Sequence, residues 1–430
     1  MMTKKPPPAD APEIASVAPT RRHLIAALGT AGSIAAFGVK PTTASAADCT
    51  PDQESDGTLD SQPFFGKRQS GVVTPQPAAA TVAAFDVLAD DRAGLEKMLR
   101  ILTSRISGLT KAGPAPVLDP KLPPAESGLL GPQLYPDNLT VTVSVGASLF
   151  DDRFGIAAQK PKRLVTMERF SNDALDPKFC HGDLLLQICS NTAETNIHAL
   201  RDLIKNMPDL IALRWKLDGF LPPHTIKRAG KDTVRNLLGF KDGTANLDGR
   251  DDALMDRVVW VQSNSDEPAW AAGGSYQVVR IIRNLVERWD RTPLAEQQRI
   301  IGRDKMSGAP LGMNAERDSP DYAKDPKGER ISLDAHIRLA NPRTRETDAS
   351  LILRRPYNFS RGISASGQLD MGLLFVCFQS DLNAGFLTVQ KRLNNEPLEE
   401  YIKPTGGGYF FVLPGVPDES AFLGQGLLGA

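Results

Sequence analysis

Three ionisable residues in the second half of the chain have types and spacing that fit a single reaction centre. Asp242 follows a short apolar run and stands on a glycine-flanked turn, in NLLGFKDGTANLDG. His336 lies in HIRLANPR, and Arg354 follows it in ILRRPYNFSRG. An Asp-Gly pair by itself indicates only a turn, because both residues tolerate positive φ. A carboxylate, an imidazole and a guanidinium together indicate chemistry.

The reaction that suits these three groups is peroxide cleavage at a haem. A neutral imidazole can bind ferric iron on one side of the ring. On the other side, a carboxylate can carry a proton from one peroxide oxygen to the other, while a guanidinium stabilises the departing negative charge. We therefore expect His336 as the axial iron ligand and Asp242 with Arg354 as the catalytic pair. Because aspartate is a stronger acid than histidinium, we also expect activity weighted toward acidic pH.

The elements that must position these groups occur twice along the chain. Apolar patterns in the first half predict strands at 81–89, 139–150, 182–190 and 209–220, with helices at 91–109 and 191–207. The second half repeats the order with a strand at 275–285, a helix at 292–304, a strand at 372–379 and a further amphipathic helix. The match favours an internal duplication. The sequence predicts an α+β protein with a duplicated ferredoxin-like fold, two antiparallel sheets and helices packed on them.

Composition shifts divide the chain into four parts. Residues 1–46 contain Arg21-Arg22, a weakly apolar run and a small-residue cleavage site at 44–46, which indicate a twin-arginine export signal or, alternatively, an ordinary one. Residues 47–80 are polar and proline-bearing, and we expect a flexible arm. An N-terminal ferredoxin-like unit at 81–225 and a C-terminal, haem-binding unit at 226–430 follow. Either export route predicts a periplasmic or otherwise exported protein without a stable membrane anchor.

Charge and cysteine content exclude several classes of protein. The 430 residues carry a formal net charge of -1, so the sequence lacks the basic excess typical of nucleic-acid binding. No Cys-x-x-Cys spacing occurs, so a zinc ribbon and covalent c-type haem attachment lack support. Cys189 and Cys377 lie in apolar strand-like runs and are expected as buried thiols. The pairing of Cys49 and Cys180 stays open.

The chain resembles the dye-decolorizing peroxidase family, in its exported deferrochelatase/peroxidase subgroup. The resemblance runs from about 81 to the end and depends on four strings in order: RNLLGFKDGTAN, HIRLANPR, ILRRPYNFSRG and GLLFVCFQSDLNAGFLTVQ. Its Gly-x-x-Asp-Gly motif is weak alone, but the four together are specific. The resemblance implies one non-covalent haem b per chain, hydrogen peroxide as oxidant with a reducing substrate, and Asp242 in place of a distal histidine.

Further residues are candidates for the same site, each with a structural alternative. Asp381 could accept a hydrogen bond from His336, or it could cap the helix that follows. Arg338 and Arg343 could pair with haem propionates, or form surface salt bridges. Asn246 and Ser360 are expected in the distal pocket. Apolar residues near the site could line the haem or belong to the core: Leu353, Leu373 and Phe375.

Two alternative functions stay open at this point. One is a deferrochelatase that releases iron from haem for iron acquisition. The other is a haem-free ferredoxin-like binding module, in which Asp242 only shapes a turn. A homodimer is possible. Bulky reducing substrates would need a surface tyrosine or tryptophan as an electron relay, for which the six tyrosines and four tryptophans are candidates: Trp215, Trp260, Trp270 and Trp289.

Overall fold

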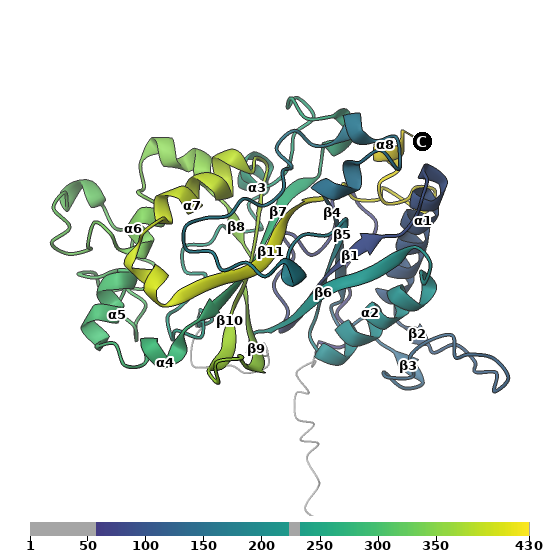
Figure 1. The fold of residues 1–430 in the computed structure, drawn as a ribbon, viewed down its shortest axis with the longest axis horizontal. Coiled ribbons are helices and arrows are strands. Elements are labelled where there is room, and N and C mark those ends of the chain that lie inside the picture. The colour runs from purple at the N-terminus through teal and green to yellow at the C-terminus, as the bar shows by residue number, and fades with distance from the viewer. Residues whose placement is uncertain (1–56, 223–232, 430) are drawn as a thin grey trace, which may run out of the picture. The chain divides into compact units, whose positions relative to one another are not determined.

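The computed structural model describes residues 57–222 and 233–429, all of them within the unit Glu54–Ala430 (Figure 1). The predicted export signal, Cys49, the first part of the predicted arm and the predicted boundary at 225 lie outside the described residues. Within the described residues, no helix combines the length and the apolar character needed to cross a membrane.

The first half follows the order strand, helix, strand, strand, helix, strand. Its elements are β1 (Ala79–Val87), α1 (Arg92–Leu109), β4 (Thr140–Gly146), β5 (Leu184–Ser190), α2 (Ala193–Asn206) and β6 (Ile211–Phe220). A short hairpin of β2 (Gly113–Pro114) and β3 (Gln133–Leu134) is inserted after α1. The strands lie in the order β4-β5-β1-β6, which is that of a ferredoxin-like sheet.

The second half has the same strand order with longer insertions. Its strands are β7 (Ser275–Asn284), β8 (Leu353–Arg354), β9 (Tyr357–Ile363), β10 (Leu369–Gln379) and β11 (Ile402–Val412). Its helices are α3 (Asp252–Val258), α4 (Val286–Trp289), α5 (Leu294–Ile301), α6 (His336–Ala340), α7 (Thr388–Leu393) and α8 (Gln425–Leu428). The order β9-β10-β7-β11 repeats that of the first half, so the predicted duplication is confirmed.

The two predicted sheets are joined at both edges. Strand β4 pairs with β11, and β6 pairs with β9 through Phe220 and Asn358, so eight antiparallel strands close into a ring. Side chains alternate across each strand, and those inside the ring form one apolar core that includes Val82, Trp215 and Phe410. The joined edges leave few unpaired strand groups, which protects the sheets from pairing with other chains.

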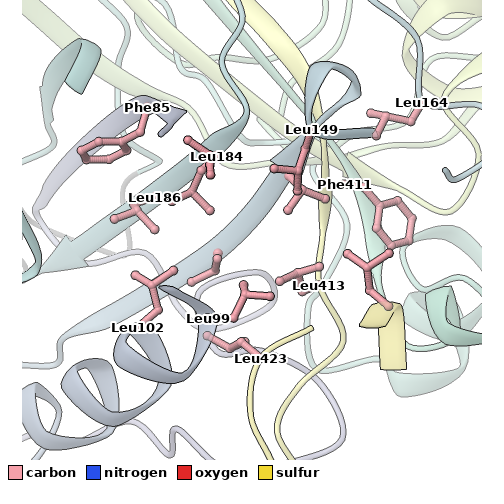
Figure 2. Packing of buried hydrophobic residues seen from close by; sticks show 14 of the residues in the cluster. Phe85, Leu99, Leu102, Leu149, Leu164, Leu184, Leu186, Phe411, Leu413 and Leu423 are labelled. Atoms are coloured by element: carbon pink, nitrogen blue, oxygen red, sulfur yellow. The ribbon is translucent and has the colours of Figure 1, made fainter. Parts of the chain in front are cut away.

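Helices cover the outer face of the first half. Leu95, Leu99, Leu102 and Ile106 recur at helical spacing on α1, and all are buried against strands β1, β4 and β5. Figure 2 shows this layer, with Leu99 and Leu102 lying beneath the sheet residues. Full burial of each such leucine contributes about 2 kcal/mol of hydrophobic stabilisation.

The predicted flexible arm at 47–80 is wrong for its described part, 57–80. The Gln69 side chain donates to the carbonyl oxygens of Val143 and Leu413 and accepts from the Val143 N–H, each at 2.8 Å. It therefore joins the end of β11 to β4, while Val72 is buried in the ring core. Proline and polar residues in this segment favoured an exposed arm. The sequence alone does not reveal that the buried Gln69 amide forms hydrogen bonds with backbone groups of β4 and of the residue after β11.

Candidate active site

Hydrogen bonds within residues 234–242 shape the turn that carries Asp242. The Asp242 N–H donates to the Val234 carbonyl at 2.8 Å, and the Asn236 side chain accepts from the Phe240 N–H at 3.2 Å. Phe240 is buried beside Trp289, with ring centroids 6.0 Å apart. Gly243 follows at φ +120°, a conformation that L side chains rarely adopt. The buried apolar residues before Asp242 thus attach the turn to the core. Gly243 allows the chain to change direction after Asp242.

Arg354 is brought to Asp242 by strand β8. Its Nη1 donates to Asp242 Oδ1 at 2.6 Å, and the two side chains are 29% and 12% exposed. The Asn246 amide bonds both the N–H and the carbonyl of Arg354, at 2.9 and 2.7 Å. Since β8 pairs with β10 opposite Cys377, the guanidinium is fixed to the sheet from one side and to the Asp242 loop from the other.

His336 is the first residue of the short helix α6, and a buried carboxylate orients its ring. His336 Nδ1 lies 2.7 Å from Glu396 Oε2, and the Glu396 side chain is only 3% exposed. Burial lowers the pKa of His336, but the Glu396 carboxylate more than offsets this, so the pKa is raised overall. A carboxylate acceptor places the proton on Nδ1 and leaves the Nε2 lone pair for a metal.

The placement of α6 depends on a close approach to α5. Helix α5 ends at Ile301 and is capped by Gly302, which has φ +91°; a Cβ atom at Gly302 would lie 2.7 Å from Ile337 Cγ1. A larger residue would push α6 outward. This glycine therefore allows the helix that carries His336 to pack against α5.

All three residues line one cavity of about 300 Å³ on the outer face of the second half. Its floor is formed by cross-strand neighbours, with Leu373 opposite Ile282 and Pro404 opposite the same residue. Phe375 and Phe386 extend the apolar lining. A mostly apolar cavity with a few convergent polar groups is typical of a cofactor site.

Two further arginines, Arg303 and Arg343, add positive charge to the cavity lining. Arg303 is 6% exposed, and its guanidinium donates hydrogen bonds to the carbonyl oxygens of Gly308 and Glu316 rather than to a carboxylate. Burial, together with the guanidiniums of Arg343 and Arg354, lowers the pKa of Arg303. A buried cation without a carboxylate partner favours an anionic ligand, as the propionate groups of haem would be. The donor set therefore fits haem: an oriented imidazole, an apolar floor and spare guanidiniums.

Comparison with known families agrees with this geometry. The N-terminal model of the Dyp-type peroxidases matches residues 69–221, and the C-terminal model matches residues 233–417. The chain belongs to the Dyp-type peroxidase family. It is accordingly a haem-dependent peroxidase that uses hydrogen peroxide to oxidise reducing substrates.

Several relatives of this peroxidase are similar over nearly their whole length. It is 60% identical over 425 residues to a deferrochelatase of Yersinia pestis, covering 97% of each chain. It is 58% identical over 414 residues to a deferrochelatase of Escherichia coli K12, covering 95% of this chain and 97% of that one. Among solved structures, a DyP-type peroxidase of Cellulomonas bogoriensis has 36% identity and a TM-score of 0.78, over 87% of this chain and 99% of that one. Ferric DtpA of Streptomyces lividans has 34% identity and a TM-score of 0.77, with the same coverage.

The predicted contact between His336 and Asp381 is wrong. Asp381 instead pairs with Arg163 at 3.1 Å and accepts from the N–H groups of Asn383 and Ala384. It is thus the helix cap that the sequence offered as the alternative, and Glu396 takes the place beside the histidine.

Three other expected positions, those of Arg338, Asn246 and Ser360, are also corrected. Arg338 forms hydrogen bonds with Asp325 and stacks over Tyr322, and it does not line the cavity. Arg343 does line the cavity. Asn246 fastens the backbone of Arg354 rather than lining the pocket. Ser360 lies exposed on β9 and is not among the described lining residues.

The structure distinguishes cavity residues from core residues among the apolar candidates. Leu373 and Phe375 line the cavity, whereas Leu353 belongs to the ring core. Cys189 and Cys377 are fully buried free thiols, as predicted, and Cys180 is a buried free thiol as well. Trp289 packs directly behind the cavity residue Phe240.

Sequence reasoning missed two residues of this site. Glu396 lies in NNEPLEE, where neither spacing nor an apolar run distinguishes it from Glu399 and Glu400. Arg303 follows α5 in a segment that reads as an ordinary polar helix end. Only the fold brings them to the cavity.

Proposed function

We propose that this protein is an exported peroxidase that holds one non-covalent haem b per chain, with His336 as the axial ligand and Asp242 and Arg354 as the catalytic pair. The observation that carries the proposal is the arrangement of the cavity: His336, held by Glu396, lines the same space as the Asp242–Arg354 pair. Arg303 and Arg343 are the propionate partners in this proposal. Among the described lining residues there is no cysteine, which agrees with non-covalent binding.

When bound, haem supplies the iron at which the peroxide O–O bond breaks and the store of oxidising equivalents that reducing substrates later consume. Asp242 carries the proton. Because Asp242 Oδ1 already accepts a hydrogen bond from Arg354 Nη1, we propose that Asp242 Oδ2 accepts the peroxide proton. It takes that proton from one peroxide oxygen and returns it to the other, which then leaves as water. The Arg354 guanidinium stabilises the negative charge that develops on the leaving oxygen.

The proposal is tested by mixing peroxide with the ferric protein and with its Asp242→Asn variant in a stopped-flow spectrometer. Asparagine preserves the shape of the side chain but cannot accept the proton, so the second-order rate constant should fall by about 10²- to 10⁴-fold. Haem content, measured from the Soret band, should stay at one per chain. A wild-type rate in the variant would remove Asp242 from the mechanism.

Iron release from haem is a second candidate activity, because relatives at 58–60% identity are named deferrochelatases. In that reaction the porphyrin loses one iron ion and gains two protons on its nitrogens. The test is to incubate the protein with haem and to quantify both chelatable iron and metal-free porphyrin. Equal yields of the two would support this activity, whereas iron without intact porphyrin would indicate oxidative ring damage. The haem-free binding module is not the reading that the family supports.

Export by the twin-arginine pathway and a homodimer both stay predictions. Replacement of Arg21 and Arg22 by lysine should retain the protein in the cytoplasm if the twin-arginine signal is used, and cell fractionation measures this. Light scattering during size-exclusion chromatography measures the oligomeric state.

A further inference from the structure

Glu316, in the long loop between α5 and α6, contacts the Asp242 turn on both sides of the catalytic residue. Its Oε2 accepts from Lys241 Nζ at 2.6 Å, one residue before Asp242. Its Oε1 accepts from Thr244 Oγ1 at 2.9 Å, two residues after it, and also from the Thr233 hydroxyl. One carboxylate therefore bridges the segment that enters the turn and the segment that leaves it.

This bridge is shielded from water and charged. The side chains of Glu316 and Lys241 are 17% and 10% exposed, so solvent screens their attraction less than at an open surface. Burial alone would raise the pKa of Glu316, but the hydrogen bonds from Lys241, Thr233 and Thr244 lower it to about 2. Glu316 therefore stays ionised at acidic pH, where peroxidase activity is expected.

The same residue joins the turn to the positive part of the cavity. The Glu316 carbonyl accepts from Arg303 Nη1 at 3.0 Å, and Arg303 also bonds the Gly308 carbonyl. Gly308 has φ +77°, and a Cβ atom there would lie 2.6 Å from Lys241 Cδ. The loop from Arg303 to Glu316 is thus packed tightly on the lysine beside Asp242.

The Asp242 turn needs such support because glycines flank it. Gly239 and Gly243 both have positive φ, at +85° and +120°, and glycine leaves the backbone many alternative conformations. A misplacement of about 1 Å at a catalytic group can cost about 100-fold in rate. The glycines allow the turn to form, but they do not hold it in one place.

We propose that Glu316 is a positioning residue that holds Asp242 in register with Arg354 for proton transfer. The proposal rests on the proposed function, in which Asp242 carries the peroxide proton. Glu316 touches neither peroxide nor haem in this account, and it acts only through the residues on either side of Asp242.

The test compares Glu316→Gln with a matched control, Glu329→Gln, which removes one charge from an exposed side chain of the same loop. Glutamine keeps an acceptor for the threonines but loses the charge that holds Lys241. We expect the rate constant for peroxide to fall by about 10- to 100-fold in Glu316→Gln, with haem content near wild type. The melting temperature should fall because the stabilising charge of the bridge is lost. The control should match wild type in all three measurements.

Fluoride binding to the ferric protein gives a readout that does not depend on turnover. Bound fluoride is stabilised by hydrogen bonds from the distal side, so a displaced Asp242–Arg354 pair should weaken its binding by about 10-fold. Wild-type fluoride affinity together with a wild-type peroxide rate in Glu316→Gln would overturn the proposal.

A double-mutant cycle with Asp242→Asn separates positioning from a general structural role. If Glu316 acts through Asp242, Glu316→Gln should cause no further loss of peroxide rate in the Asp242→Asn background. An equal loss in both backgrounds would overturn the positioning role. If Asp242→Asn alone reacts at the wild-type rate, the proposed function fails instead, and fluoride affinity still reports whether Glu316 orders the distal side.

Discussion

The two ferredoxin-like halves share one strand order but use the outer face of the sheet in opposite ways. In the first half, α1 and α2 cover this face with apolar side chains, of which Figure 2 labels Leu99 and Leu102 of α1. In the second half, the corresponding face of β7, β10 and β11 forms the floor of the cavity. The comparison shows that duplication supplied a second sheet whose apolar face did not have to be filled by its own helices.

Backbone irregularity marks the place where the second half departs from the first. The helix after β5 is the regular α2, whereas the chain after β10 passes through a π-helical turn, Asn383–Leu387, with Gly385 at non-helical ψ before α7 begins. Such turns are often found at functional sites. Phe386 and Val389, on either side of its end, line the cavity. The π-helical turn and α7 therefore form a wall of the cavity, whereas α2 packs directly on the sheet of the first half.

The largest effect on haem binding should follow from replacement of His336, the proposed iron ligand. His336→Ala removes the proposed iron ligand, and haem affinity should fall by more than about 100-fold, because even the partner of a metal ligand contributes 10- to 100-fold. Titration of the haem-free protein with haem, followed at the Soret band, measures this. The melting temperature of the haem-free protein should also fall, because the buried Glu396 carboxylate loses its hydrogen bond to the imidazole.

Core truncation in the two halves should have different consequences. Leu186→Ala, in the fully buried layer of the first half, should lower the free energy of unfolding by about 2–5 kcal/mol. Phe375→Ala, on the cavity floor, should cost about 1 kcal/mol in haem-free protein because its side chain already faces open space. Urea denaturation measures both. Equal losses would mean that the second half is packed as a continuous core.

The same contrast explains how much was predictable from the sequence. Local patterns revealed the duplicated strands, because apolar alternation is set by burial on each face. Asp242, His336 and Arg354 were identifiable as candidates because turn glycines and basic segments set them apart. Glu396 and Arg303 were not, because no local pattern distinguishes a carboxylate or guanidinium that only the fold brings to the cavity. Asp381 was a candidate both for the hydrogen bond with His336 and for a helix cap, and the sequence alone does not distinguish the two.

Substitution of Glu396, the carboxylate beside His336, should lower haem affinity less than loss of His336 itself. Glu396→Gln keeps a hydrogen-bond acceptor for Nδ1 but removes the negative charge, so haem affinity should fall by about 10-fold. Less electron density then reaches the iron, and the reduction potential of the bound haem should rise. Spectroelectrochemical titration measures the potential. Glu400→Gln, an exposed glutamate of the same segment, is the matched control, and a potential that rises equally in both variants would contradict the assigned role of Glu396.

Acid should loosen the second half before the first, although the effect is the smallest of the four. The folded pKa of Glu316 is lowered from 4.5 to about 2, so this carboxylate adds stability that is complete above the unfolded value and lost as the pH falls toward the folded value. Wild-type protein should therefore lose about 1 kcal/mol from this group at pH 4 relative to pH 7. Glu316→Gln has no such group, and its stability should decline less over the same interval. Hydrogen exchange can localise the change when each rate is divided by the intrinsic exchange rate at the same pH. In wild type, amides at 233–249 should lose protection on acidification while those at 184–206 in the apolar layer do not. Equal losses of protection in both segments would mean that acid acts on the whole molecule and that the charged bridge does not set the stability of the Asp242 turn.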